Sequence, residues 1–333
     1  MTLVSDNVAA RESESCEGTC AHTNCLFEQP WWLDAVAPSQ WREIMVEKGG
    51  EVFARMTYFS RKKFGLTLST NPPLTPTLGP WLRPTEGKYA TRLAMQHELL
   101  GELIEQLPNF DLFSQNLSGA VSNVLPFHWR GYDHFTRYTY QLADLRDLEQ
   151  IEHGFSEACR RTIRKAQKQL TVQDNLSIQD FYRIVEKTWL RQGRKPNVGR
   201  DLLIRLDEVC RRRGQGRIFH AEDVGGNIHA AVYIVWDERS AYYLLGGADP
   251  EFRSSGAHSL LMWCAIQFAA EVTRVFDFEG SMNQQIERFF RSFGPRQATF
   301  IGVRRISRRL AALTAVKELG EACAGGRRLR WFF

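Results

Sequence analysis

Two carboxyl groups and one guanidinium lie close together in the C-terminal quarter of the sequence. Asp277 and Glu279 are separated by a single residue at the end of a short expected strand, which runs into Gly280. Successive side chains of a strand point to opposite faces, so at most one of the two carboxylates should enter a given cleft. We expect Glu279 to be that residue, because the backbone at Gly280 can approach a ligand closely. A cap on the following helix, or an ion pair with Arg291, explains either carboxylate equally well.

Arg291 follows Phe290 in an aromatic and basic segment that ends at Gly294. A guanidinium keeps its positive charge and offers five hydrogen-bond donors, but it cannot exchange a proton. Carboxylates act as general acids and bases, and cationic donors stabilise an oxyanion as it develops. The candidate catalytic residues are therefore Asp277, Glu279 and Arg291.

A second group of residues can bind an anion at the start of a helix. The pattern predicts a strand over residues 241–245, which runs into glycines, and a strongly apolar helix over residues 256–270. Backbone amides at a helix start have no partner within the helix and bind anions. The candidate phosphate-binding residues here are Gly247, Arg253, Ser255 and Gly256. A helix capped by a serine explains the segment equally well.

Positive charge is concentrated in the second half of the chain. Residues 1–150 hold 13 Lys and Arg against 18 Asp and Glu, a balance of −5, whereas residues 151–333 hold 30 against 20, a balance of +10. This asymmetry indicates an anionic partner, such as a nucleotide, an RNA or a phosphorylated acceptor. The candidate RNA-binding residues lie on an expected helix over residues 155–170 and are Arg160, Arg161, Arg164 and Lys165. A solvated helix face is the common alternative.

The same order of elements is expected twice along the chain. A hairpin over residues 52–59 and 64–68 turns at the basic residues 61–63, and a helix over 96–107 and a strand over 110–113 follow. In the second half, a hairpin over 218–224 and 228–236 precedes the strand over 241–245, the helix over 256–270 and a strand over 275–278. Such a repeat is typical of a duplicated domain. Further helices are expected over residues 178–192, 200–213 and 307–322.

Two motifs resemble the FemAB-like branch of the GNAT superfamily. They are Phe276-Asp277-Phe278-Glu279-Gly280-Ser281-Met282 and Ile286-Glu287-Arg288-Phe289-Phe290-Arg291-Ser292-Phe293-Gly294. Trp31-Trp32-Leu33-Asp34 and the proline-rich loop that ends in Leu78-Gly79-Pro80-Trp81 are also similar to that branch, and the resemblance extends over about residues 27–305.

The resemblance implies an α/β (α+β) fold of two tandem GNAT-like domains, each a mixed central sheet flanked by helices. We expect a disordered tail over residues 1–25, domains over 26–138 and 139–306, and an amphipathic helix with a basic tail over 307–333. The implied activity is transfer of an aminoacyl or acyl group to an amine, which forms an amide bond. The implied donor is aminoacyl-tRNA or acyl-CoA, with no tightly bound cofactor. The implied acceptor is an amine on a small molecule or a cell-envelope precursor.

The resemblance also assigns roles to residues. Arg291 takes the place of the lysine that meets the developing charge in Fem-type enzymes, so we expect a cleft beside Glu279 in which Arg291 lies next to a carbonyl attacked by nitrogen. Residues 253–258 partly match the loop that holds the pyrophosphate of coenzyme A, but His258 stands where a small residue is usual. The implied substrate-binding residues are Phe290, Ser281, Trp189, Arg191, Gln192 and Trp81. Core packing of the aromatic residues, and a helix C-terminus at Arg191, are the structural alternatives.

The remaining features exclude several other classes of protein. Residues 1–24 do not resemble a secretory signal, and the longest nearly apolar stretch, residues 260–270, is too short to span a bilayer, so we expect a cytoplasmic protein without an integral membrane span. Seven scattered cysteines indicate reduced thiols. The spacing of Cys16, Cys20, His22 and Cys25 fits no standard zinc pattern, so no metal site is expected.

Three functions are consistent with the sequence. The first is aminoacyl or acyl transfer to an amine, with aminoacyl-tRNA as the candidate donor and tRNA as the candidate partner. The second is an acetyl- or acyl-CoA-dependent N-acetyltransferase on the same fold. The third is a non-catalytic module that binds RNA or a membrane surface through the basic helix and the arginine-rich tail of residues 327–333.

Overall fold

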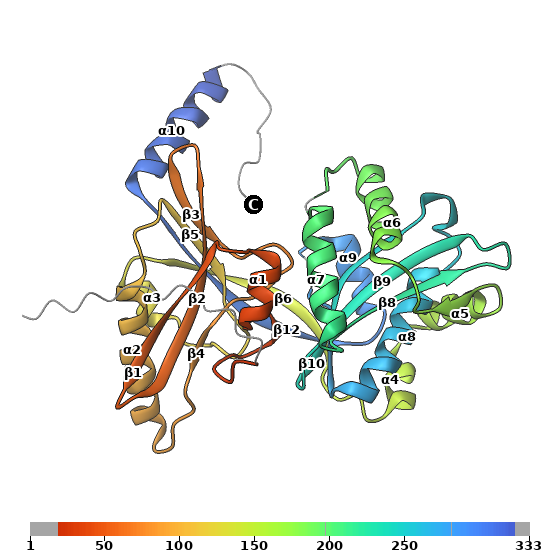
Figure 1. The fold of residues 1–333 in the computed structure, drawn as a ribbon, viewed down its shortest axis with the longest axis horizontal. Coiled ribbons are helices and arrows are strands. Elements are labelled where there is room, and N and C mark those ends of the chain that lie inside the picture. The colour runs from red at the N-terminus through yellow and green to blue at the C-terminus, as the bar shows by residue number, and fades with distance from the viewer. Residues whose placement is uncertain (1–18, 197, 281, 324–333) are drawn as a thin grey trace, which may run out of the picture.

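The computed structural model describes residues 19–196, 198–280 and 282–323, with backbone only for residues 316–323 (Figure 1). Ser281, Cys16 and the tail of residues 327–333 lie outside the described residues. The described strands are β1 Trp41–Lys48, β2 Glu51–Lys63, β3 Leu66–Thr70, β4 Pro80–Leu82, β5 Leu112–Asn116, β6 Asp133–Leu142, β7 Thr171–Gln173, β8 Gly216–Glu222, β9 Ile228–Trp236, β10 Ser240–Ala248, β11 Val275–Asp277 and β12 Arg296–Ile306. The described helices are η1 Leu26–Glu28, α1 Pro30–Val36, α2 Tyr89–Gln106, α3 Leu125–Trp129, α4 Leu148–Gly154, α5 Glu157–Gln167, α6 Ile178–Arg191, α7 Arg200–Arg212, η2 Pro250–Phe252, α8 Ala257–Val272, α9 Gln284–Arg291 and α10 Arg308–Cys323.

The two halves of the chain contain the same parallel crossover. In the first half, α2 connects β3 to its parallel partner β5. In the second half, α8 connects β10 to its parallel partner β11. A parallel pair needs a long crossover connection, usually a helix, so the two units have the same topology. The expected mixed α/β architecture with a repeated unit is confirmed.

The first hairpin differs in detail from the expectation. The strand β2 continues through the basic residues 61–63, and the turn falls at Phe64 and Gly65, which both have positive φ. The chain turns there because Gly65 adopts the left-handed conformation at little cost, whereas the three basic side chains extend along an exposed strand end. The preceding strand β1, which pairs antiparallel with β2, was not expected.

Two strands are exchanged between the halves. The strand β6 belongs by sequence to the first half but pairs with β11 of the second, and β12 from the end of the second half pairs with β5 of the first. Since β6 and β12 also pair with each other, one sheet runs through the molecule in the order β1-β2-β3-β5-β12-β6-β11-β10-β9-β8-β7, and β4 pairs with β2. Figure 1 shows β6 and β12 between the two lobes. The expected boundary between residues 138 and 139 falls within β6.

The strand β9 is buried on both of its faces. Its alternate residues contribute to two different cores: Ala231, Tyr233 and Val235 pack with α6 and α7, whereas Ala230, Val232 and Ile234 pack with α5 and α8. Helices therefore cover both faces of this part of the sheet, and a strand in that position requires an unbroken apolar run. None of the helices in the described part of the chain has the length and apolar character that crossing a bilayer requires.

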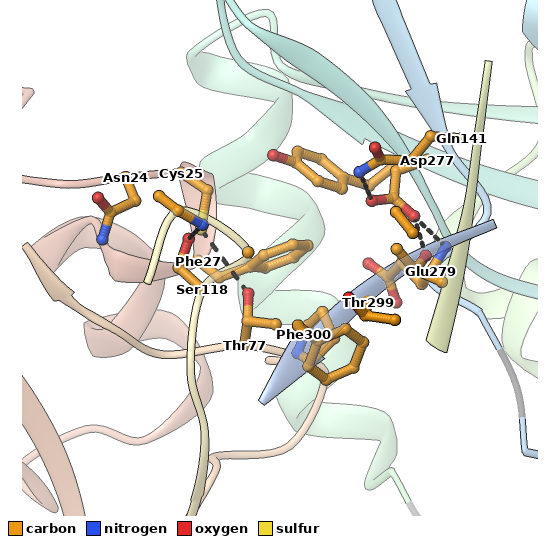
Figure 2. A pocket seen from close by; sticks show the side chains of 16 residues that line it. Asn24, Cys25, Phe27, Thr77, Ser118, Gln141, Asp277, Glu279, Thr299 and Phe300 are labelled. Atoms are coloured by element: carbon orange, nitrogen blue, oxygen red, sulfur yellow. Dashed lines mark hydrogen bonds between the residues drawn. The ribbon is translucent and has the colours of Figure 1, made fainter. Parts of the chain in front are cut away.

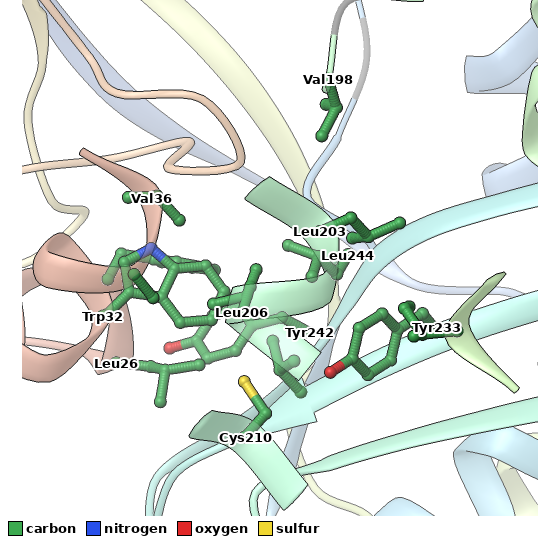
Figure 3. Packing of buried hydrophobic residues seen from close by; sticks show 14 of the residues in the cluster. Leu26, Trp32, Val36, Val198, Leu203, Leu206, Cys210, Tyr233, Tyr242 and Leu244 are labelled. Atoms are coloured by element: carbon green, nitrogen blue, oxygen red, sulfur yellow. The ribbon is translucent and has the colours of Figure 1, made fainter. Parts of the chain in front are cut away.

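The N-terminal helix α1 joins the two halves. It packs on α7 of the second half, where Trp32 and Val36 lie near Leu203 and Leu206 (Figure 3). Trp32 is 0% exposed, and its indole nitrogen donates to the hydroxyl of Thr75 at 3.1 Å. Trp31 is also buried, so the tryptophan pair belongs to the core.

Removal of the Trp32 side chain should weaken the packing of α1 against α7 that holds the two halves together. Trp32→Ala is expected to lower the free energy of unfolding by about 3–5 kcal/mol, because it leaves a cavity in a closed core. The exposed Trp129, with 60% of its surface accessible, is the matched control, and Trp129→Ala should cost less than about 1 kcal/mol. Urea unfolding of both variants measures the difference, and equal losses would contradict the assigned packing.

Candidate functional site

The chain makes an unusual turn directly after β11. Glu279 and Gly280 both have left-handed backbone conformations, with φ of 57° and 60°. This conformation is costly for a residue with a side chain and is often found at functional sites. Only glycine fits at position 280, because a Cβ atom there would overlap the backbone of Tyr138 and Thr139 in β6. Strand alternation stops at Asp277, and the turn brings the next carboxylate back to the same side.

Asp277 and Glu279 consequently line the same cavity. The expectation that at most one of them would enter a given cleft is wrong, because it assumed that the strand continued through residue 279. Figure 2 shows both carboxylates at one end of this cavity, close to Thr299.

The Asp277 carboxylate is fully occupied by hydrogen bonds within the protein. One oxygen accepts from the backbone N–H of Glu279 at 2.7 Å and from the hydroxyl of Thr139, and the other accepts from the amide of Gln141 at 2.8 Å. Burial raises its pKa, and these hydrogen bonds lower it by a smaller amount. Asp277 therefore holds the turn in place.

Glu279 has a carboxyl oxygen that the fold does not use. Its Oε1 atom is buried and accepts no hydrogen bond from the residues that the structure describes. Burial raises the pKa of this carboxyl well above its usual value, and the nearby Asp277 carboxylate raises it further. A buried carboxyl with a raised pKa exchanges its proton at a higher pH than an exposed carboxyl does.

Two cavities meet at Glu279. The smaller, of about 280 Å³, lies between the halves and is bounded by the N-terminal segment, the proline-rich loop, β6, β11 and β12. In Figure 2, Cys25, Phe27 and Thr77 lie across this cavity from Glu279. The larger, of about 660 Å³, belongs to the second half and is bounded by α5, α6, α8, α9 and the end of β10. Glu279 is the residue that lines both of them in the described part of the chain.

Seven of the sequence-predicted residues line the larger cavity. They are Arg191, Gln192, Gly247, Arg253, Gly256, Glu279 and Phe290. Gly256 begins α8 with φ of 80°, and a Cβ atom there would lie 2.7 Å from the side chain of Thr162 in α5. The hydroxyl of Ser255 accepts from the amide of Ala257, the first residue of α8, at 3.2 Å, but the N-cap residue is Gly256, which has no side chain to cap the helix. The start of α8, together with Arg253 and Arg191, makes this end of the cavity suitable for an anion.

A tyrosine and a histidine also line the larger cavity. The Tyr243 hydroxyl and the Nε2 atom of His258 lie 3.1 Å apart. Burial lowers the pKa of His258 to about 4, so its imidazole is neutral at physiological pH. In the tautomer that carries its proton on Nε2, His258 donates to the Tyr243 oxygen and leaves the phenol proton free to donate to another group. Burial raises the pKa of Tyr243, and the nearby Glu279 carboxylate raises it further, so the phenol keeps its proton.

Arg291 is not where the sequence interpretation expected it. Its side chain is 64% exposed, and its Nε atom donates to Glu287 at 2.8 Å. The neighbouring Phe290 is buried against the sheet, and consecutive residues of a helix point about 100° apart, so Arg291 is turned towards solvent. It lines neither cavity beside Glu279.

Two other expected substrate-binding residues also lie away from the cavities. Trp189 is buried in the core with α7 and β9. Trp81 lies on β4, and its ring is 4.7 Å from the ring of His22. On α5, Arg161, Arg164 and Lys165 are exposed, whereas Arg160 is half-buried and donates to the His153 carbonyl at 2.8 Å.

The comparisons with known proteins agree with this geometry. Residues 155–291 match the family model described as "Acetyltransferase (GNAT) domain". This part of the chain has the GNAT fold. It contains the end of the larger cavity beside the start of α8, the crossover β10–α8–β11 and Glu279. The expected resemblance is confirmed.

Solved structures extend the similarity of the GNAT domain to nearly the whole chain. FemX matches with a TM-score of 0.65 and 13% identity over 87% of this chain and 94% of its own. The C-terminal domain of a putative lysylphosphatidylglycerol synthetase from Agrobacterium fabrum matches with a TM-score of 0.55 and 13% identity over 89% and 92%. A tandem GNAT protein from the clavulanic acid biosynthesis pathway matches with a TM-score of 0.51 and 12% identity over 87% and 90%. No curated protein matches the chain by sequence. At these identities the likeness shows a shared fold.

The turn at Gly280 should be intolerant of a side chain. Gly280→Ala is expected to lower the melting temperature clearly, because it combines a left-handed backbone with an overlap against β6. Gly226→Ala is the control, since Gly226 has φ of 77° but no atom of the described residues lies within 4 Å of the place that the added methyl group would take. Thermal unfolding of both variants separates the two effects, and equal melting temperatures would refute the close approach.

The buried Glu279 carboxyl should destabilise the fold as the pH rises. A raised folded-state pKa means that the unfolded chain releases its proton first, so stability is lost from about pH 4.5 upwards until the folded-state pKa is reached. Glu279→Gln does not titrate and should be more stable than the parent at pH 8, by about 1.4 kcal/mol for each pH unit between the two pKa values. The gain should vanish towards pH 4.5. Glu271→Gln, on the exposed side of α8, should show no pH-dependent gain in the same urea titrations.

Proposed function

We propose that the chain is an N-acyltransferase that forms an amide bond, with Glu279 as its general base. The observation that supports this function is the position of Glu279, which lines two cavities and whose buried Oε1 atom has no hydrogen-bond partner among the described residues. An acyltransferase must bring two substrates together at one proton acceptor. In this proposal the larger cavity holds the acyl donor and the smaller one holds the acceptor amine.

The reaction proceeds by addition and elimination. The amine nitrogen attacks the donor carbonyl carbon, a C–N bond forms, and the nitrogen loses a proton to the Glu279 carboxylate. The bond between the carbonyl carbon and the leaving group then breaks, and the leaving group takes up the proton. Asp277 keeps Glu279 in place through the turn, and the Tyr243 phenol, which lines the donor cavity, supplies a hydrogen-bond donor for the charge that develops.

We propose aminoacyl-tRNA as the donor. Three basic side chains of α5 face solvent, while Thr162 of the same helix lines the donor cavity, so an RNA bound on that helix would have its end close to the site. The structural similarity to FemX agrees with the FemAB-like resemblance, which implies this donor and a cell-envelope precursor as acceptor. No tightly bound cofactor enters this proposal.

Acyl-CoA is the second candidate donor. The left-handed start of α8 at Gly256, with Arg253 and Arg191 beside it, is suited to bind a pyrophosphate. His258 weakens this candidate, because its ring lies in the first turn of the same helix and is held against Tyr243 and Phe289.

A transfer assay tests the function and the donor together. The purified chain is incubated with a panel of primary amines and with either charged tRNA or acetyl-CoA, and amide products are measured by mass spectrometry. Glu279→Gln is expected to lower the rate constant of transfer by about 10²–10⁴-fold. The parent rate should rise with pH and level off above the raised pKa of Glu279, because only the carboxylate accepts a proton.

Glu271→Gln, which removes an exposed carboxylate from α8, is the control and should keep the parent rate. Full activity of the folded Glu279→Gln variant would refute the proposed base. Products formed from acetyl-CoA but not from charged tRNA would assign the second donor.

A further inference from the structure

We infer that the smaller cavity recognises the acceptor as a compact primary alkylammonium group and rejects anions. This inference names the substrate class of the proposed acceptor site. The reaction of that substrate rests on the proposed function, whereas its binding does not. It starts from the charges of the cavity wall. Two carboxyl groups, Asp277 and Glu279, line the cavity, and no lysine, arginine or histidine of the described residues does. The remaining polar groups are neutral.

The aromatic residues of the wall suit the same charge. Phe27, Tyr242 and Phe300 all line the cavity, and the rings of Phe27 and Tyr242 lie 4.7 Å apart. Burial raises the pKa of Tyr242 well above its usual value, so its ring stays uncharged. An ammonium group is attracted to aromatic faces within about 6 Å, and the attraction increases when water is excluded.

One hydrogen-bond acceptor in the cavity has no partner. The Asp277 oxygens already accept three hydrogen bonds, whereas the buried Oε1 atom of Glu279 accepts none from the described residues. Leaving a buried acceptor without a donor is unfavourable, so a bound group that donates to it is favoured over one that does not. An ammonium has three donors and no acceptor, which matches this site.

The proton count is consistent with the reaction. The raised pKa of Glu279 favours a protonated carboxyl in the empty cavity. A neutral amine that binds there forms an ammonium–carboxylate pair with the same single proton. Return of that proton to Glu279 frees the nitrogen lone pair for attack on the donor carbonyl. The protonated carboxyl then gives this proton to the leaving group, and the resulting carboxylate accepts the second proton, which the nitrogen loses as the amide forms.

The cavity also limits the size of the group that enters. A volume of about 280 Å³ is roughly nine times the space that one water molecule occupies in the liquid, which suits an aminoalkyl chain. The wall opposite Glu279 is fixed, because Glu28 accepts from the amides of Asn24 at 2.8 Å and Gly79 at 3.0 Å. Any larger part of the acceptor must therefore extend out of the cavity.

Ligand-observed NMR on the full chain, without any donor, tests this inference. The probes are n-butylammonium, butyrate and 1-butanol, which differ in charge but share their carbon chain. We expect n-butylammonium to bind at least about tenfold more tightly than butyrate or 1-butanol. Equal binding of butyrate and n-butylammonium would overturn the inference.

Thr299, which lines the cavity from β12, offers a matched pair of variants. Thr299→Lys adds a positive charge and Thr299→Met adds a neutral chain of similar length, so their comparison isolates charge from bulk. Thr299→Lys is expected to weaken n-butylammonium binding at least about tenfold relative to Thr299→Met. Thermal unfolding verifies that both variants fold, and equal affinities in folded variants would overturn the inference.

The outcomes distinguish this inference from the proposed function. Charge-selective amine binding that is lost in Thr299→Lys supports the cavity assignment even if no donor gives an amide product, in which case the proposed function alone fails. Amide formation on acceptors whose amine does not compete with n-butylammonium would support the function and overturn the inference.

Discussion

The hydrogen bond from the Glu279 amide to the Asp277 carboxylate is the interaction on which the site depends. It closes a left-handed turn that a residue with a side chain otherwise avoids. The same carboxylate is held by Thr139 and Gln141, and Gly280 lies against the backbone of Tyr138. These three neighbours all belong to β6, the strand that the first half contributes to the second. The turn therefore exists only when the exchanged strand is in place.

Desolvation raises the pKa of Glu279 and also costs the fold free energy. The same burial that raises its pKa removes its Oε1 atom from water, and none of the residues that the structure describes gives this atom a hydrogen bond in return. The rigid surroundings compensate for this cost: a doubly covered sheet on one side, and on the other the packing of α1 against α7. Proteins commonly retain such locally unfavourable groups where function requires them.

The parts of the structure that depend on local sequence were predictable, and those that depend on distant segments were not. The apolar runs predicted β9 over residues 228–236 and α6 within one residue. The residues of the larger cavity cluster around local motifs. The smaller cavity combines segments from residues 24 to 300, and nothing in the sequence brings them together. The orientation of Arg291 could have been inferred from Glu287, four residues earlier, and from the apolar Phe290. The left-handed Glu279 could not, because its conformation is imposed by β6.

The exchange of β6 and β12 also constrains how the protein is made. The strand β5 ends at Asn116, but its partner β12 begins at Arg296, so the ribosome must add most of the chain before this edge is covered. An open strand edge readily pairs with another chain, and contacts between distant segments form slowly. Until β12 has been made, the edge of β5 is therefore open to pairing with another chain, and dilution or a chaperone during synthesis favours pairing within the same chain.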